Sequence, residues 1–372
     1  MQRRANSSTA VVPRNLAARA AAYALVGFAI LAPQLLGGAN EKACLAILLI
    51  GSVVCLGVSL SLRQTVRSLG VVPHAAAATL LAAVWTLAQV VPIPCSLAVW
   101  LHGELGQRVR TLAQLEGASP TWCTISVAPG STRVALAVAV LVCALLLAAT
   151  ALARAGQRSA LMYGIALSSV AMAAVAVAHT VFAADSVFGV YQPEAARPGL
   201  LLAPLLNGNH LAGHLALGLP LCISFAMEAK GVDARVSWWT LSFLVLTTGL
   251  FTLSRAGSAV LLAGATASFA AQLSRKEGAA RNVENRVAWF AGAACIAAAA
   301  YFTLDVLTPE FRGQTAPFRK IAMQLPVLKI ALEHPLTGIG RGALGDVTPG
   351  FVLTDTRVLY AENILVQWLS EW

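Results

Sequence analysis

The chain has 372 residues, of which 58% are hydrophobic and only 11% charged, and its mean hydropathy is +0.73. Soluble domains carry about 25% charged residues, so this composition excludes a water-soluble globular protein and indicates a membrane protein. The net charge of +10 does not indicate a nucleic-acid partner, because the basic residues gather in short loops between apolar runs.

Apolar runs that approach the roughly 20 residues needed to cross a bilayer as a helix recur along the chain. They do not alternate apolar and polar residues, as the strands of a membrane barrel do. We therefore predict an all-α, polytopic membrane protein. Its nine predicted spans are residues 18–36, 43–62, 71–91, 133–153, 159–181, 207–228, 237–252, 256–273 and 287–305.

Basic residues are distributed unevenly between the two ends of these spans. If the N-terminus is cytoplasmic, the short outer connections hold only Lys42, Arg197 and Arg255. The cytoplasmic segments then hold 14 basic residues, namely Arg3, Arg4, Arg14, Arg19, Arg63, Arg67, Arg154, Arg158, Lys230, Arg235, Arg275, Lys276, Arg281 and Arg286. This asymmetry follows the positive-inside rule and predicts a cytoplasmic N-terminus.

Arg255 interrupts the apolar run LTTGLFTLSRAGSAVLLAGA, although a charge at the centre of a bilayer costs roughly 2.5–3.5 kcal/mol. A single span over 237–273 would place the basic loops before and after it on opposite faces of the membrane. A hairpin that turns at Ser254-Arg255 places both loops in the cytoplasm. We therefore predict the hairpin, with Arg255 at its outer tip, where it can meet an anionic ligand.

Two long segments, 92–132 and 306–363, lie outside by the same count, and long loops without spans are usually functional. We divide the chain into a transmembrane domain at 1–305, a large extracytoplasmic loop at 306–363 and the start of a tenth span at 364–372. The sequence ends at Trp372, before that span could cross, so we expect further spans in the intact protein.

The run LLNGNHLAGHLALGLPL places Asn207, Asn209, His210 and His214 at the outer start of a span. Amides and imidazoles can hydrogen-bond sugar hydroxyls or phosphate oxygens, and the N-terminus of a helix adds the positive end of its dipole. The alternative is that the asparagines cap the helix. Both roles are compatible, so we include all four residues among the candidate substrate-binding residues.

No metal site is predicted. The seven cysteines show no CxxC spacing, and His210 and His214, four residues apart on one helical face, have no evident third ligand. Cys95 and Cys123 are the only cysteines that share a predicted loop, where they could form a disulfide.

The stretch HPLTGIGRGALG contains Gly340, Gly342 and Gly345 in a GxGxxG spacing. A dinucleotide site also needs a preceding strand and a βαβ unit, which this outer loop lacks. We interpret the glycines as a tight turn that brings the backbone close to a ligand or another loop. The preceding stretch, FRKIAMQLPVLKIALEHPL, predicts an amphipathic interfacial helix whose leading Arg319 and Lys320 either anchor it in lipid headgroups or reach a lipid diphosphate.

Six segments in this order resemble the O-antigen ligase and O-antigen polymerase superfamily, over about residues 75 to 372. The segments are VVPIP, WCTISVAPGSTR, Arg197 with LLLAPLLNGNHLAGHLALGLPL, LSRAG, FRKIAMQLPVLKIALEHPLTGIGRGALG and YAENILVQWLSEW. The resemblance implies a membrane-embedded transferase of a glycan linked to polyprenyl diphosphate, located in a bacterial inner membrane with its active site outside. It also implies that neither metal nor nucleotide is needed, and that arginines hold the diphosphate.

The leaving diphosphate needs charge stabilisation, for which Arg197, Arg255 and Arg319 are the candidates. Many ligases carry a His-Asn pair where this chain has Glu362-Asn363. Glu362 can accept a proton from the acceptor hydroxyl, and the alternative is a solvated loop carboxylate. We therefore predict Glu362, Arg255 and Arg319 as catalytic. The substrate-binding candidates are Arg197, Asn207, Asn209, His210, His214, Asn363 and Lys320.

The expected partners are the lipid-linked glycan donor, a lipid or glycan acceptor, and membrane lipids. Our leading hypothesis is a ligase, and the alternatives within this class are an O-antigen polymerase and a protein O-oligosaccharyltransferase. A transporter or flippase of lipid-linked sugars is the alternative from a different class. A transporter is expected to show internal repeats with helices interrupted near the midplane, whereas this sequence shows no repeat and groups its polar residues at one face.

Overall fold

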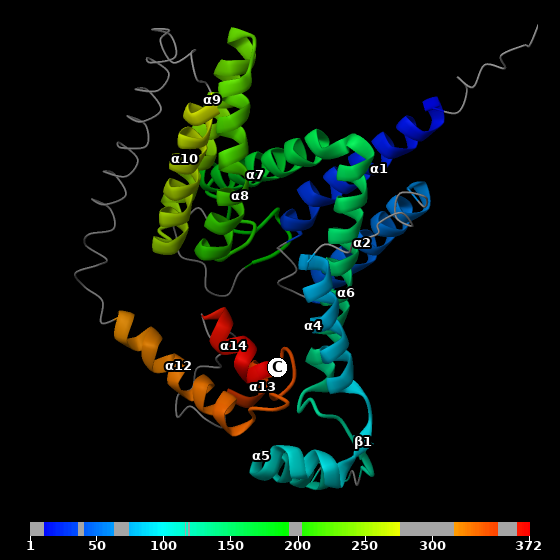
Figure 1. The fold of residues 1–372 in the computed structure, drawn as a ribbon. Coiled ribbons are helices and arrows are strands. Elements are labelled where there is room, and N and C mark those ends of the chain that lie inside the picture. Colours follow the sequence, from blue (N-terminus) through cyan, green and yellow to red (C-terminus); the bar gives the residue numbers. More distant parts are fainter. Residues whose placement is uncertain are drawn as a thin grey trace, which may run out of the picture. The chain divides into compact units, whose positions relative to one another are not determined.

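The computed structural model describes residues 11–35, 41–62, 74–115, 117, 120–192, 203–275, 316–348 and 363–372 (Figure 1). These residues are almost entirely helical, which confirms the all-α class. The helices are α1 (Val11–Gln34), α2 (Glu41–Ser61), α4 (His74–Val90), α5 (Cys95–Leu115), α6 (Pro129–Leu152), α7 (Arg158–Val181), α8 (Gly208–Glu228), α9 (Val232–Phe251), α10 (Arg255–Arg275), α12 (Ala316–Glu333), α13 (Leu344–Val347) and α14 (Ile364–Glu371). A short π-helical turn, η2 (Ala153–Gln157), joins α6 to α7, and two short strands, β1 (Ile93–Pro94) and β2 (Trp122–Cys123), pair antiparallel.

Helices occupy eight of the nine predicted spans, and the ninth, 287–305, lies outside the described residues. Within the described part of the chain, four segments are long and apolar enough to cross a membrane: Leu16–Gln34, Lys42–Ser61, Pro129–Val181 and Gly208–Glu228. The third contains both α6 and α7. The structure thus supports a membrane protein of the helical type, and the count of nine spans stays a prediction.

The predicted break between 252 and 255 is confirmed. α9 ends at Phe251 and α10 begins at Arg255, so 237–273 is not one continuous helix. Ser254 ends the interruption as the N-terminal cap of α10, because its Oγ accepts a hydrogen bond from the backbone N–H of Gly257 at 3.0 Å.

The chain divides into two compact units. The first contains residues 1–69 and 148–312, and its central helix is α8, which packs against α7, α9 and α10. Its hydrophobic core includes Met172 of α7, Leu215 and Leu219 of α8, Val245 of α9 and Leu261 of α10. α1 packs on α7, and α2 packs on α1.

The second unit contains residues 70–147 and 313–372, so the boundary between the units falls within α6. α12 packs against α14, and a buried apolar cluster that includes Ile330, Ile339 and Leu344 joins α12 to the loop after it. β1 and β2 bring Cys95 and Cys123 together in a disulfide with a Cα–Cα distance of 4.8 Å, which confirms that these cysteines pair.

Close packing of α8 against α10 depends on Gly257. An added Cβ there would lie 2.2 Å from Cβ of Ala212 in α8 and 2.8 Å from Ser254 Oγ. Overpacking of this kind costs about 1–3 kcal/mol. Gly257→Ala should therefore lower the thermal unfolding midpoint of the protein in lipid nanodiscs.

Gly213→Ala is the matched control, because a Cβ on this exposed glycine of α8 would meet no atom within 4 Å. Alanine favours a helix over glycine by about 0.8–1 kcal/mol, so the control should unfold at the same or a higher temperature. Equal midpoints for the two variants would contradict the close approach of α8 and α10.

Candidate functional site

In the first unit, the N-termini of α8 and α10 are joined by side-chain hydrogen bonds. Asn207 caps α8, since its Oδ1 accepts from the backbone N–H of Asn209 at 2.9 Å and of His210 at 3.3 Å. Ser254, the cap of α10, donates its hydroxyl proton to Asn209 Oδ1 at 2.7 Å. The structure thus brings the Asn207–His210 run and Arg255 to the same end of the helix bundle.

Each of these helix starts is preceded by a leucine with left-handed backbone. Leu206, before Asn207, has φ 59°, and Leu253, before Ser254, has φ 56°. A left-handed conformation costs a non-glycine residue roughly 1–2 kcal/mol, and such strain persists only where the surroundings impose it. Its presence at both helix starts makes this junction a candidate for function, because strained backbone gathers at active sites and ligand-binding sites.

The electrostatics of this junction favour an anion. The first N–H groups of a helix lack intrahelical partners, and the helix dipole adds partial positive charge there, so two adjacent N-termini can bind phosphate oxygens. Thr248 Oγ1, in the last turn of α9, and Ser258 Oγ, in the first turn of α10, are buried without a hydrogen-bond partner. The sequence alone does not distinguish these hydroxyls from other serines and threonines in the spans. Thr248 lies four residues before Thr252, and Ser258 lies four residues after Ser254, on the two sides of the turn.

His210 and His214 have different surroundings despite their helical spacing. His210 is exposed in the first turn of α8. His214 Nε2 lies 3.1 Å from Ser168 Oγ of α7, which also donates to the carbonyl of Ala29 in α1. His214 therefore links three helices inside the bundle, and His210 is the histidine that is open at the helix end. Among the residues that the structure describes, no three His, Cys, Asp or Glu side chains group as metal ligands.

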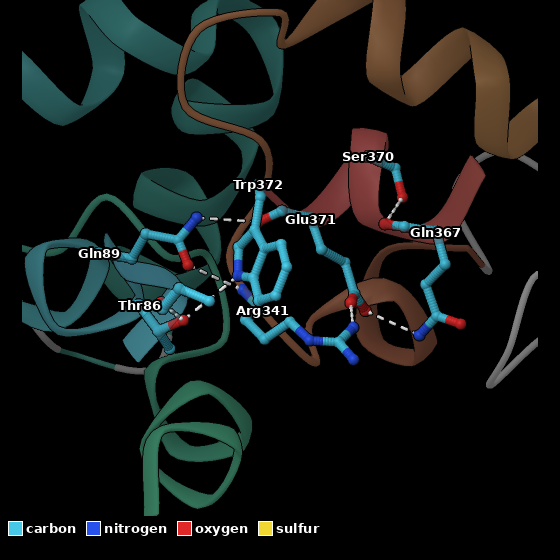
Figure 2. Close-up of polar contacts among 8 residues, drawn as sticks. Thr86, Gln89, Arg341, Gln367, Ser370, Glu371 and Trp372 are labelled. Atoms are coloured by element: carbon cyan, nitrogen blue, oxygen red, sulfur yellow. Dashed lines mark hydrogen bonds and ion pairs between the residues drawn. The ribbon is translucent and has the colours of Figure 1, made fainter. Parts of the chain in front are cut away.

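In the second unit, the side chain of Gln89 connects three segments (Figure 2). Its Nε2 donates to the carbonyl oxygens of Thr337 at 2.9 Å and Glu371 at 2.8 Å, and its Oε1 accepts from the backbone N–H of Arg341 at 3.0 Å. The end of α4 is thereby joined to the loop at 334–343, which we call the glycine-containing loop, and to the end of α14. All three of these partners are backbone groups, and both the nitrogen and the oxygen of this fully buried amide are hydrogen-bonded.

A buried ion pair reinforces this connection. The carboxylate of Glu371 is fully buried and pairs with the Arg341 guanidinium, and Gln367 Nε2 donates to Glu371 Oε1 at 3.3 Å. The Arg341 guanidinium also lies 5.2 Å from the centroid of the Trp372 ring. Burial lowers the pKa of Arg341. Nothing local in the sequence indicates this pairing, because Arg341 and Glu371 are 30 residues apart.

The glycines of HPLTGIGRGALG allow close contact between loops. Gly338, Gly340 and Gly342 have φ values of 56°, 106° and 84°. A Cβ at Gly340 would lie 2.2 Å from Ser126 Oγ, and one at Gly338 would lie 2.4 Å from the carbonyl carbon of Glu371. This confirms the tight turn against another loop for Gly340 and Gly342, whereas Gly345 lies within α13.

The segment 122–133 packs along the same loop. Val127 N–H donates to the carbonyl of Ile339 at 3.0 Å, and Ser131 Oγ donates to Asp346 Oδ2 at 3.1 Å. Four of the six segments that carry the family resemblance, namely the end of α4, 122–133, the glycine-containing loop and α14, thus assemble in the second unit. The Asn207–His210 and LSRAG segments assemble in the first.

The remaining predicted site residues are described in part. Arg255 is the first residue of α10, and Arg319 and Lys320 lie at the start of α12, but their side chains lie outside the described part, as do Arg197 and Glu362 entirely. Asn363 caps α14, because its Oδ1 accepts from Leu365 N–H at 3.1 Å and Val366 N–H at 3.4 Å. Comparison of the chain with protein-family models, curated proteins and solved structures finds no match.

Two histidines meet between α5 and the end of α12. Their Nδ1 atoms are 3.5 Å apart, and the other ring nitrogen of His102 contacts the carbonyl of Ile125. Burial lowers the pKa of His102, although the contact with Ile125 raises it in part. Burial also lowers the pKa of His334, and His102 lowers it further, while Glu333 opposes these effects. Burial therefore favours the neutral form of both imidazoles.

This pair makes the fold sensitive to acid. Because the folded-state pKa of each histidine lies below its ordinary value of 6.5, their contribution to stability is complete above about pH 6.5 and is lost as pH falls through the lowered values. The thermal unfolding midpoint should fall between pH 7 and about pH 5. The double variant His102→Gln, His334→Gln should show a weaker pH dependence, and His74→Gln, at an exposed position, should keep the wild-type dependence. An unchanged slope in the double variant would exclude this pair as the cause.

Proposed function

We propose that this protein transfers a glycan from a polyprenyl-diphosphate carrier to an acceptor hydroxyl at the outer face of a bacterial inner membrane. The observation that carries the proposal is the hydrogen bond between Ser254 and Asn209, which joins the N-termini of α8 and α10. The junction offers two positive helix ends, the Asn207–His210 amides and imidazole, and Arg255 at the first position of α10. These groups match the charge and the oxygen atoms of a diphosphate joined to a sugar.

The proposed reaction breaks the bond between the anomeric carbon and the diphosphate oxygen, which leaves with the electron pair. The acceptor oxygen forms the new bond to the anomeric carbon and loses its proton. Arg255, together with Arg197 and Arg319, would stabilise the negative charge that develops on the leaving diphosphate. Glu362 would accept the proton of the acceptor hydroxyl or orient that hydroxyl. In this scheme Asn209, His210, Lys320 and Asn363 bind sugar hydroxyls or phosphate oxygens.

Contacts in the second unit support an outer location for the two long loops. Val127 in one predicted loop bonds to Ile339 in the other, and His102 meets His334, so the two loops belong on one side of the membrane. The disulfide between Cys95 and Cys123 supports the outer side, because disulfides persist in the periplasm and are rare in the cytosol.

The polymerase and the protein O-oligosaccharyltransferase use the same donor chemistry and remain alternatives that differ only in acceptor. A flippase moves the lipid-linked sugar across the membrane and catalyses no glycan transfer. The grouping of polar residues at the ends of α8, α9 and α10, rather than at mid-helix breaks, favours the transferase.

Release of undecaprenyl diphosphate tests the function without knowledge of the acceptor. The purified protein in nanodiscs, given undecaprenyl-diphosphate-linked oligosaccharide and a membrane extract that supplies acceptors, should release free undecaprenyl diphosphate, measured by mass spectrometry. Arg255→Lys keeps the charge but loses the bidentate fork, and hydrogen bonds to charged groups contribute about 1.5–3 kcal/mol, so release should fall roughly 10- to 100-fold. Arg255→Ala should be slower still.

The control for this measurement is Lys230→Ala, an exposed basic residue just after the opposite end of α8, which should release at the wild-type rate. Near-wild-type release by Arg255→Ala, at equal protein amounts, would remove Arg255 from the site. Translocation of the donor lipid by wild-type protein without any release would replace the transferase with a flippase.

Single cysteines test the orientation. In a variant that lacks Cys44, Cys55, Cys143, Cys222 and Cys295 but keeps the disulfide, Arg110→Cys and Lys329→Cys should react with a membrane-impermeant maleimide on intact spheroplasts. Asp233→Cys should react only after the membrane is permeabilised, because it belongs to a predicted cytoplasmic loop. The reverse pattern would invert the topology and place the proposed site in the cytoplasm.

A further inference from the structure

Two tryptophans in the segment between α4 and α6 are exposed. Trp100 is 75% exposed in the first half of α5, and Trp122 is 64% exposed in β2. Leu97, one turn before Trp100, and Val91, just after α4, are also exposed. We refer to Val91, Leu97, Trp100 and Trp122 as the tryptophan corner. Large apolar side chains gathered on a surface mark a contact with a partner or a membrane.

Local covalent and hydrogen-bonding constraints hold this corner at the end of α4. Trp122 pairs with Pro94 in the β1–β2 ladder, and the neighbouring disulfide joins Cys123 to Cys95, the first residue of α5. α4 ends at Val90, so Trp122 is held close to the end of that helix. Trp100 is five residues along α5 from Cys95, about 7.5 Å at 1.5 Å per residue.

The exposed apolar surface of α4 leads up to the corner. Leu80, Leu81, Val84 and Leu87 of α4 are all at least half exposed, and Val91 follows directly after the helix. α4 has 17 residues, the lower limit of the range that spans a bilayer, and it is an apolar helix shorter than the four segments that meet the full length. With α4 across the membrane, the tryptophan corner lies where this helix leaves the hydrocarbon, and tryptophan prefers this boundary because its ring is apolar and its N–H is polar.

α5 runs across the end of α4 instead of continuing its direction (Figure 1). A helix so placed lies along the membrane plane when α4 crosses the membrane. Its exposed surface changes at Gly103, where the helix is interrupted with φ 54°. Before Gly103 the exposed side chains include Leu97 and Trp100. After it they are mostly polar, namely Glu104, Gln107, Arg108, Arg110, Thr111 and Gln114, with Val109 and Leu115 as the exposed apolar side chains.

We propose that the tryptophan corner docks on the lipid bilayer, with Trp100 and Trp122 in the boundary between headgroups and acyl chains, and that it holds the disulfide-linked start of α5 against the membrane. The occupant is the lipid surface, because the exposed apolar side chains continue from α4 through the first half of α5, whereas the exposed side chains after Gly103 are mostly polar. This inference depends on α4 crossing the bilayer and is independent of any glycan transfer.

Photocrosslinking identifies what covers the corner. The full chain carries p-azidophenylalanine in place of Trp100, Trp122 or, as control, the exposed Gln107 after the interruption. Each variant is reconstituted in nanodiscs of phosphatidylethanolamine and phosphatidylglycerol and irradiated, and the adducts are identified by mass spectrometry. We expect phospholipid adducts at positions 100 and 122 at several-fold higher yield than at 107.

Formation of the disulfide between Cys95 and Cys123 and a monodisperse elution profile serve as tests of folding. If the variant at Trp100 fails them, the same photoprobe at Leu97, on the same half of α5, replaces it. An adduct to a second copy of the chain would show a protein interface and overturn the proposal. Lipid yields at positions 97, 100 and 122 that are no higher than at 107 would also overturn it.

Discussion

Most buried polar side chains in the described part of this chain pair with other groups of the chain, because an unpaired polar group is costly in an apolar interior. The carboxylate of Glu371 shows the consequence most clearly. It is fully buried, and an unpaired charge in such a place would cost several kcal/mol, so it pairs with Arg341 and accepts a further hydrogen bond from Gln367. The Gln89 amide is likewise buried and uses both its oxygen and its nitrogen. The ion pair of Glu371 with Arg341 and the hydrogen bonds of Gln89 together hold α4, the glycine-containing loop and α14 in one arrangement.

In the first unit, neutral side chains form the corresponding hydrogen bonds between helices. Ser168 hydrogen-bonds both His214 and the carbonyl of Ala29, and Ser254 bonds both Asn209 and the start of its own helix. Close packing is needed for such short side chains to reach across helices, and Gly257 and Gly218 provide it by leaving no Cβ at the contact. Helix packing and polar pairing therefore depend on each other here, as is usual for helices that associate without a hydrophobic driving force in lipid.

These pairings also shape the proposed chemistry. Asn207 and Ser254 each satisfy backbone groups of a helix start, and the left-handed Leu206 and Leu253 set the direction in which each helix begins. The resulting junction brings together positive helix ends and neutral hydrogen-bonding groups. A transferase that works on a diphosphate donor needs such preorganised positive charge, because the leaving group carries the negative charge of the transition state.

The amino-acid sequence by itself determined the class of the protein, the positions of most helices, the interruption before Arg255, the turn at Gly340 and Gly342, and a cysteine pair able to form a disulfide. These features depend on local properties: the length of apolar runs, the cap at Ser254 and the freedom of glycine at positive φ. Only the tertiary structure decided that Gln89 bonds to the backbone of Arg341, 252 residues away, that Arg341 pairs with Glu371, and that His214 bonds to Ser168 while His210 stays exposed. Several partners of the right chemistry exist for each of these groups, and the path of the chain selects one, because a hydrogen bond forms only where the folded backbone brings donor and acceptor within about 3 Å.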